Sequence, residues 1–468
     1  MREFSGELGA RLDEQPVGRG HRRVTLLAGL GWMFDAMDIG LLSFVMVALA
    51  QEWGLSQGQV GVAISVGLFG MFVGAAASGV LADRYGRKVI LLVTMLVYSI
   101  ATGLTALVWG YGALLVLRFI TGLGLGGELP VASTLVAEVA PTKQRGRMLV
   151  LLESFWAYGW ILAAIIGYLV IPEYGWRIAF LIGALPAFYV LVLRRSLPES
   201  PRYLLRQGRN EEARQAAATF GVTVDDKGEK EPDTAAENPG GNGLGLKELW
   251  SGPYARRTAM LWVLWFGLVF SYYGIFTWLP QILATSAGYG LVRSFEFVLL
   301  ITLAQIPGYF SAAYLVEKWG RKPTLVVYLL GSAAAALAFG LRGLGAEASG
   351  AEIVLWGSLV SFFNLGAWGV LYGYTPELYP THARGSGAGW AAGIGRTGGI
   401  VGPLLVPVLL DAQGFGPTAV FVMFAAVLLV IALDVLFLGE ETKGRALEEI
   451  SEAPERPAVS TTPAGNRI

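Results

Sequence analysis

The sequence predicts an all-α polytopic membrane protein of twelve transmembrane helices, arranged as two pseudo-symmetric six-helix bundles. Three observations support this fold class. The 468 residues are 54% hydrophobic and 15% charged, with a mean hydropathy of +0.55, whereas soluble domains average about 25% charged residues. Long apolar runs recur along the chain, each close to the roughly 20 residues that cross a bilayer as a helix. Finally, two loop motifs of the first half recur in the second half.

Six apolar runs are expected in each half. In the first half they cover 24–50, 57–82, 89–109, 111–137, 148–171 and 176–196. In the second half they cover 257–283, 295–317, 323–343, 351–376, 385–410 and 416–438. The expected parts are an N-terminal cytoplasmic segment (1–23), a first bundle (24–196), a cytoplasmic linker (197–256), a second bundle (257–438) and a cytoplasmic tail (439–468). The linker is expected to hold an amphipathic helix over 201–219, followed by polar, Gly- and Pro-containing chain over 222–245.

Basic residues in the short loops predict the orientation. The loops on one side carry Arg84, Arg87, Lys88, Lys143, Arg145, Arg147, Lys318, Arg321, Lys322 and Arg384. The other side offers Arg177, Arg293 and Arg342. Because short cytoplasmic loops are enriched in Lys and Arg, we expect the basic side and both termini to be cytoplasmic.

The composition excludes several classes of function. Lys plus Arg and Asp plus Glu are equal at 35 each, so no bulk positive charge favours nucleic acid. The chain has no cysteine, so it cannot form a thiolate metal site. Its two histidines, His21 and His382, are far apart in the sequence, so they are not expected to bind a metal as a pair. It also lacks a GxxxxGK[ST] phosphate-binding motif and a buried histidine for Ser–His–Asp catalysis. We therefore expect no enzyme, no cofactor and no metal.

Two loop motifs relate the halves. Residues 83–88, DRYGRK, recur as EKWGRK at 317–322. The Glu, Pro, Thr, Arg and Gly of 138–146 recur with identical spacing in 377–385. Parallel six-helix repeats place a substrate site near the membrane midplane, on the pseudo-symmetry axis. The repeat therefore predicts a central site between the two halves.

These motifs resemble those of a known superfamily. GVLADRYGRK (79–88) is similar to the loop signature of the major facilitator superfamily. Motifs that resemble its sugar-porter and organic-ion branches are RFITGLGLGGE (118–128), PESPRYLL (198–205) and EETKG (440–444). Four segments are most similar to bacterial niacin (nicotinate) transporters, a group related to synaptic vesicle glycoprotein 2. They are GWMFDAMDIGLLSF (31–44), GLGLGGELPVASTLVAE (122–138), LLESFWAYGW (151–160) and YYGIFTWLP (272–280). The Gln-rich seventh helix of sugar porters is absent, which weakens a sugar assignment.

The resemblance implies that the repeated motifs latch the cytoplasmic ends of the halves in an outward-open state. We expect Gly79 to permit close helix approach, Gly86 to form a tight turn, and Asp83 to bind a helix N-terminus and an arginine. The expected ion pairs are Glu138–Arg145 and Glu377–Arg384. The full set is Gly79, Asp83, Arg84, Gly86, Arg87, Glu138, Arg145, Glu317, Arg321, Glu377 and Arg384. The alternative is that these residues determine only topology and folding.

Ionisable residues inside the spans indicate a proton pathway. A charge at mid-bilayer costs roughly 2.5–3.5 kcal/mol on insertion scales, so it usually has a partner or a function. Asp35 and Asp38 share one helix face, and two neighbouring carboxylates favour proton binding. By resemblance, Asp38 matches the first-helix aspartate of proton-coupled sugar porters, and Arg118 matches its partner. The alternative is a permanent structural ion pair.

A substrate site is expected around Arg396, which lies among glycines in GIGRTGGIVGP. Organic anion transporters carry an arginine at the matching position, and a guanidinium can bind a carboxylate bidentately. The alternative is an ion pair of Arg396 with Glu128 or Glu153. Mid-span aromatics suit stacking on a pyridine ring, although such residues often serve packing alone. The other candidate contacts are Trp156, Tyr273, Trp368, Tyr372, Asn364, Glu128 and Glu153.

Together, the motifs and buried charges imply a monomeric secondary transporter of the inner membrane. The expected activity is proton-coupled uptake of a small aromatic carboxylate such as nicotinate, by alternating access. The expected partners are this substrate, protons and the lipid bilayer. A carrier of another aromatic acid or of a sugar is the first alternative. A non-transporting membrane nutrient sensor is the second.

Overall fold

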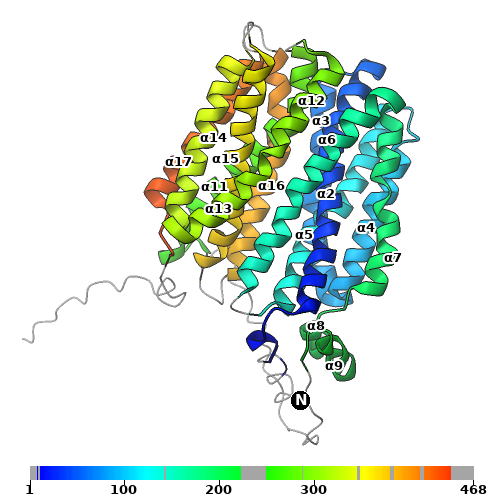
Figure 1. The fold of residues 1–468 in the computed structure, drawn as a ribbon, viewed down its shortest axis with the longest axis vertical. Helices are drawn as coiled ribbons and strands as arrows, with labels where there is room; N and C mark the ends of the chain where they lie inside the picture. The colour runs from blue at the N-terminus through cyan, green and yellow to red at the C-terminus, as the bar shows by residue number, and fades with distance from the viewer. Residues whose placement is uncertain are drawn as a thin grey trace, which may run out of the picture.

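The computed structural model describes residues 8, 11–141, 144–222, 249–286, 288–344, 348–379, 384–411 and 416–443. Regular structure in these ranges is helical (Figure 1). The first half contains α2 (Arg19–Trp53), α3 (Gln57–Tyr85), α4 (Arg87–Thr105), α5 (Tyr111–Val139), α6 (Arg145–Gly183) and α7 (Pro186–Ser196). The second half contains η2 (Gly252–Tyr254), α11 (Ala255–Gln281), η3 (Ile282–Ser286), α12 (Gly290–Leu303), α13 (Gln305–Trp319), α14 (Arg321–Ala338), η4 (Phe339–Gly343), α15 (Gly350–Glu377), α16 (Arg384–Asp411) and α17 (Pro417–Leu438).

Eleven of the described helical segments are long and apolar enough to cross a membrane. One of them, Arg145–Ser196, has 52 residues. That is about 78 Å of helix, more than twice a hydrocarbon core of roughly 30 Å. Gly175 interrupts the segment with a left-handed φ of 80°, between the predicted spans 148–171 and 176–196. The segment is therefore long enough for two crossings.

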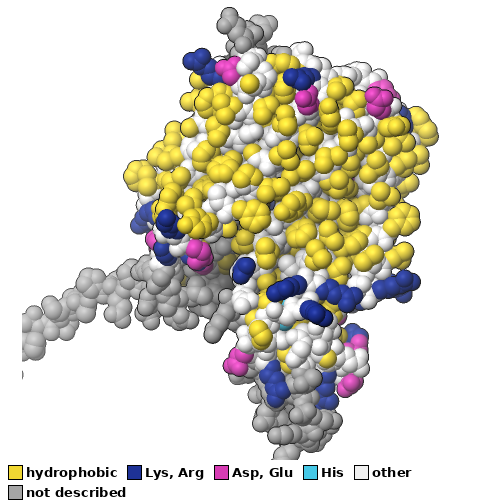
Figure 2. Space-filling model, viewed as in Figure 1, with side chains coloured by type: hydrophobic (Ala, Val, Ile, Leu, Met, Phe, Trp, Pro, Cys, Tyr) yellow, Lys and Arg dark blue, Asp and Glu magenta, His cyan; other side chains and the backbone are white. Residues whose placement is uncertain are grey.

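The surface has the polarity of a membrane protein. Figure 2 shows hydrophobic side chains covering the middle of the visible face, with most charged side chains near its two ends. A row of Lys and Arg side chains lies near the end that carries the short linker helices (Figures 1 and 2). A large continuous apolar surface of this kind marks contact with a membrane or a protein partner, and here its position between two charged ends fits a lipid bilayer.

The two halves pack their helices in a matching way. In the first half, a Cβ at Gly159 of α6 would clash with the backbone oxygen of Met33 in α2. In the second half, a Cβ at Gly398 of α16 would clash with the backbone oxygen of Phe266 in α11. Small residues allow transmembrane helix backbones to approach this closely. The first and fifth spans of each half thus pack through equivalent glycines.

The halves also contact each other away from the linker end. Ser65 Oγ of α3 donates to the backbone oxygen of Ile400 in α16, at 2.9 Å. Phe44 of α2 packs edge-on against Phe295 of α12, with ring centroids 5.0 Å apart. These contacts join the two bundles on the side opposite the basic loops.

The linker contains two short helices where the sequence suggests one. They are α8 (Pro201–Arg206) and α9 (Asn210–Ala218). Gly208 lies between them with a left-handed φ of 72°, a conformation that ends helices. The expectation of one continuous helix over 201–219 is therefore wrong. Residues 223–245 of the expected polar stretch, and the tail beyond residue 443, lie outside the described residues.

Candidate functional site

An aromatic cluster lies where the two halves meet at mid-bundle. The Nε1 of Trp156 donates to the hydroxyl of Tyr272 at 2.6 Å, which joins α6 to α11. Tyr272 packs edge-on against Tyr273 and Trp368, with centroid distances of 5.3 and 5.7 Å. Tyr372 follows, 5.7 Å from Trp368. The four aromatic residues expected to contact substrate are thus linked through Tyr272, which the sequence analysis did not select.

Arg396 adjoins this cluster from α16. Its side chain is half-buried and interacts electrostatically with the hydroxyls of Tyr273 and Tyr372. Within the described part of the chain, it makes no hydrogen bond or ion pair. The alternative pairing of Arg396 with Glu128 or Glu153 is therefore not present. The guanidinium is available to an anionic ligand.

Of the other expected polar contacts, Glu153 lies near the aromatic cluster, whereas Glu128 and Asn364 contact residues outside it. Glu153 is buried on α6 and interacts electrostatically with Tyr372 of the aromatic cluster. Glu128 accepts a hydrogen bond from Thr94 Oγ1 at 3.1 Å, inside the first half. Asn364 is buried between α14 and α15, where its Nδ2 donates to Ser332 Oγ at 3.4 Å.

Asp38 and Arg118 form a buried ion pair within the first half. Arg118 Nη1 lies 3.5 Å from Asp38 Oδ2, and both side chains are almost fully buried. Thr102 Oγ1 donates to Asp38 Oδ1 at 2.5 Å, and Arg118 Nη2 donates to Thr105 Oγ1 at 2.8 Å. A small pocket lies beside the pair and reaches Thr277 of α11. The pair therefore borders a space shared by both halves.

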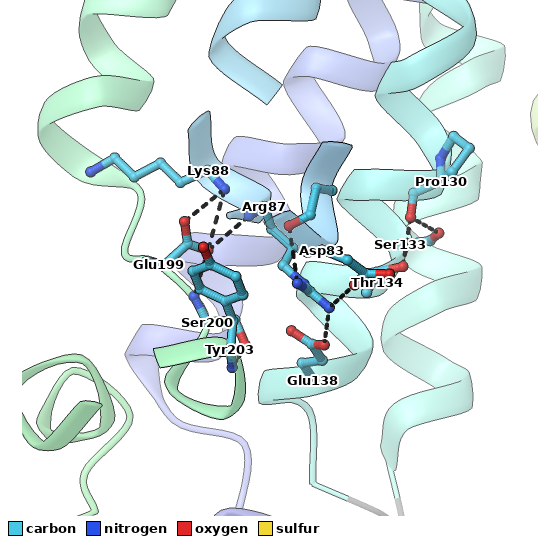
Figure 3. Close-up of polar contacts among 11 residues, drawn as sticks. Asp83, Arg87, Lys88, Pro130, Ser133, Thr134, Glu138, Glu199, Ser200 and Tyr203 are labelled. Atoms are coloured by element: carbon cyan, nitrogen blue, oxygen red, sulfur yellow. Dashed lines mark hydrogen bonds and ion pairs between the residues drawn. The ribbon is translucent and has the colours of Figure 1, made fainter. Parts of the chain in front are cut away.

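The basic loop of the first half forms a network at the end of the bundle (Figure 3). Arg87 Nη2 donates to Asp83 Oδ1 at 2.9 Å and to Glu138 Oε1 at 3.0 Å. Arg145 instead pairs with Asp13, at 2.9 Å. The expected Glu138–Arg145 pair is wrong because the buried Arg87 side chain lies between the two carboxylates, whereas Arg145 turns to the N-terminal segment.

The second half repeats part of this network. Arg321 Nη2 donates to Glu377 Oε1 at 3.0 Å, and Thr442 Oγ1 donates to Glu377 Oε2 at 2.5 Å. Glu317, which replaces the aspartate of the first loop, is exposed. The side chain of Arg384 lies outside the described part, so the expected Glu377–Arg384 pair does too. Each arginine of the repeated GRK sequence thus binds the glutamate at the end of the fourth span.

A second pair of glutamates closes both loops, and sequence reasoning missed it. The carboxylate of Glu199 accepts hydrogen bonds from the backbone N–H groups of Arg87 (3.1 Å) and Lys88 (3.2 Å). In the second half, the carboxylate of Glu441 accepts from Arg321 N and Lys322 N, both at 3.0 Å. These N–H groups open α4 and α14 and have no partner within their helices. The glutamates lie in PES and EET, and their shared Glu–Ser/Thr pattern is the signal that could have revealed them.

The glycine before each arginine has the role expected for Gly86. Gly86 and Gly320 adopt φ angles of 102° and 106°, a region that favours glycine. A Cβ would also clash with Glu199 at Gly86 and would lie 2.5 Å from Glu441 at Gly320. Gly79 differs: it is exposed and a Cβ there would meet open space. The close helix approach expected at Gly79 is therefore absent in this structure. Arg84 contributes its backbone oxygen, which accepts from Tyr203 OH at 3.1 Å.

Comparisons with known proteins agree on the type of protein. A family model described as "Sugar (and other) transporter" matches residues 28–453. The niacin transporter NiaP of Acinetobacter baylyi is 49% identical over 95% of this chain and 99% of its own length. A putative niacin/nicotinamide transporter of Bacillus subtilis is 47% identical over 93% and 99%. The Synaptic vesicle 2-related protein of Xenopus laevis is 30% identical over 93% and 81%.

The fold matches a solved transporter. The xylose transporter XylE from E. coli, in a partially occluded inward-open conformation, superposes with a TM-score of 0.72. The match covers 92% of this chain and 100% of that one, at 18% sequence identity. At that identity the match establishes the fold alone.

Proposed function

The chain belongs to the sugar (and other) transporter family of the major facilitator superfamily, and on that premise we propose that it takes up nicotinate together with protons by alternating access. The resemblance inferred from the motifs is thereby confirmed, and the chain is a multi-pass transporter of the inner membrane. We further propose twelve spans, cytoplasmic termini, a monomeric carrier and no enzymatic step.

The observation that carries the substrate assignment is the placement of Arg396. Its half-buried guanidinium has no hydrogen bond or ion pair among the described residues, and its charge acts on the Tyr273 and Tyr372 hydroxyls. One turn further along α16, a Cβ on Gly399 would lie 3.2 Å from the Tyr273 ring. A guanidinium binds a carboxylate through two parallel hydrogen bonds, and aromatic side chains stack on a flat ring. A pyridine carboxylate offers both features in one small molecule. Two relatives named for niacin transport, each nearly half identical to this chain, support the same choice.

The Asp38–Arg118 pair supports proton coupling. A buried ion pair is destabilised when one partner loses its charge, because the other charge is left uncompensated. Protonation of Asp38 would release Arg118 and thereby change the packing of α2 against α5. The adjoining pocket touches α11 through Thr277, so this change would be felt at the boundary between the halves. We propose that this step biases the exchange between inward- and outward-facing states.

The two loop networks support a role in the same exchange. In this structure each GRK arginine binds a glutamate of its own half: Arg87 binds Glu138, and Arg321 binds Glu377. We propose that the loops approach each other when the opposite side opens, so that their charges latch the two halves there.

Uptake by liposomes that contain only the purified chain tests the proposal. We expect nicotinate to accumulate when the interior is made alkaline, and to leave chemically unchanged. Benzoate should compete because it keeps the ring and the carboxylate. Nicotinamide, which lacks the charge, and xylose should compete weakly. Accumulation of xylose but not nicotinate would favour a sugar carrier, and no uptake of any of these compounds would favour a sensor.

A further inference from the structure

A buried acidic pair lies inside the first half, one helical turn from Asp38. A Cβ built on Gly31 would be 2.7 Å from Glu128 Oε1, so the glutamate carboxyl lies directly against α2. Gly31 and Asp35 are four residues apart and therefore lie on the same face of that helix. Both carboxyl groups are fully buried, and they interact electrostatically with each other.

The pair lacks the partners that ionised carboxylates need. Within the described residues, Thr94 Oγ1 donates to one oxygen of Glu128, whereas Glu128 Oε1 has no hydrogen bond and Asp35 faces a single neutral donor, the hydroxyl of Tyr98. This Tyr98 hydroxyl, on α4, is buried and interacts electrostatically with both acids. Among the described residues, no Lys, Arg or His forms an ion pair with Asp35 or Glu128. The neighbouring cation, Arg118, is held by Asp38 and Thr105.

Two buried carboxylates without a cation would be strongly destabilising. An uncompensated buried ion is strongly disfavoured, and a second like charge nearby adds to the penalty. A bound proton removes one charge and supplies the donor that these oxygens lack. From this geometry we infer that Asp35 and Glu128 share a second proton-binding site, distinct from the Asp38–Arg118 pair.

This site is linked to the proposed substrate site. Tyr273 interacts electrostatically with both Asp35 and Arg396, so a charge on the acidic pair is felt where the carboxylate would bind. Proton binding to the pair would therefore favour binding of an anion, and by linkage the anion would favour proton binding. The other titratable or charged groups around the pair are Asp38, Arg118, Tyr98, Tyr189 and Tyr273. This inference rests on the proposed function, since the linkage needs an anionic substrate.

The test counts the protons taken up when nicotinate binds to the purified full chain in lipid nanodiscs. Calorimetry in buffers of different ionisation enthalpy gives this number as the pH is varied. Each proton taken up should weaken binding by about tenfold per pH unit on the alkaline side. Asp35→Asn and Glu128→Gln should each take up one proton fewer and lose that tenfold dependence. Glu173→Gln, at an exposed carboxyl of α6, should match the wild type.

Several outcomes separate this inference from the proposed function. Unchanged proton numbers in both variants would overturn the second site. Competition of sodium with protons for the same effect would replace it by a cation site. If nicotinate fails to bind at any pH, the proposed substrate is wrong. Infrared titration without substrate then decides: a protonated-carboxyl band lost in Glu128→Gln supports the site, and its absence from the wild type overturns it.

Discussion

The two halves share a helix arrangement but carry different buried chemistry. The first half holds a buried acid pair and a buried ion pair, on α2 and α5: Asp35, Glu128, Asp38 and Arg118. The second half holds the unpaired Arg396 beside Tyr273 and Tyr372. The structural repeat of the helices therefore does not extend to these side chains. The comparison suggests that one half binds protons and the other binds the carboxylate, and that aromatic contacts such as Trp156–Tyr272 join them.

The largest effect is expected at the ion pair of the first half. Asp38→Asn removes the carboxylate that carries the proposed proton and leaves Arg118 without its counterion. We expect loss of nicotinate accumulation driven by a pH gradient, because the amide cannot exchange a proton. Exchange of internal for external nicotinate should persist. Accumulation and exchange are both measured with labelled nicotinate in liposomes. Gradient-driven accumulation by Asp38→Asn at the wild-type level would show that Asp38 does not carry the coupled proton.

The second largest effect is expected at Arg396. Arg396→Ala removes a charge-assisted, bidentate contact, which is worth roughly 1.5–3 kcal/mol. We expect nicotinate binding to weaken about 10- to 100-fold and nicotinamide binding to change little. Arg396→Lys should recover part of the loss because it keeps the charge but not the fork. Binding is measured by calorimetry, and equal losses for the acid and the amide would reject the charge pairing.

A smaller, matched effect should appear at the two loops. Gly86→Ala and Gly320→Ala each force a Cβ into a positive φ and against a glutamate. We expect each to destabilise the chain by about 1–3 kcal/mol, seen as a lower Tm in detergent. Gly79→Ala, where a Cβ meets open space, is the control. A Tm loss for only one of the two loops would show that the repeat is not equivalent at this point.

The smallest effect concerns pH. Burial raises the pKa of Glu199, and hydrogen bonds from the backbone of Ser200, Lys88 and Arg87 offset this only in part. A raised folded-state pKa means that stability from this group is greatest below its ordinary pKa and falls as the pH rises through the raised value. Glu199→Gln should flatten the Tm between about pH 4 and 6. Glu441→Gln is the matched substitution in the second half. If the pH dependence of Tm is identical in the wild type and in both variants, Glu199 does not contribute to the pH dependence of stability.

The sequence predicted the features that repeat locally or match a family motif. Apolar runs located the long helices, and the first-helix motif pointed to the Asp38–Arg118 contact. Contacts between segments that are far apart in the sequence could not be predicted. Glu199 lies 112 residues from its partner Arg87, and the Glu–Ser/Thr pattern that it shares with Glu441 does not indicate which residue is the partner. Spacing alone also suggested Arg145 as the partner of Glu138, because sequence proximity does not tell which way a side chain turns.

The most direct test of the proposal that one half binds protons and the other binds nicotinate measures the nicotinate flux and the proton flux together. Nicotinate is added to liposomes that contain the purified chain, while a pH electrode records the outer medium. If protons enter with the substrate, the outer medium becomes alkaline as nicotinate enters. We predict that the wild type takes up both nicotinate and protons. We also predict that Asp38→Asn shows no net uptake of either. Nicotinate entry by the wild type without alkalinisation would contradict the account.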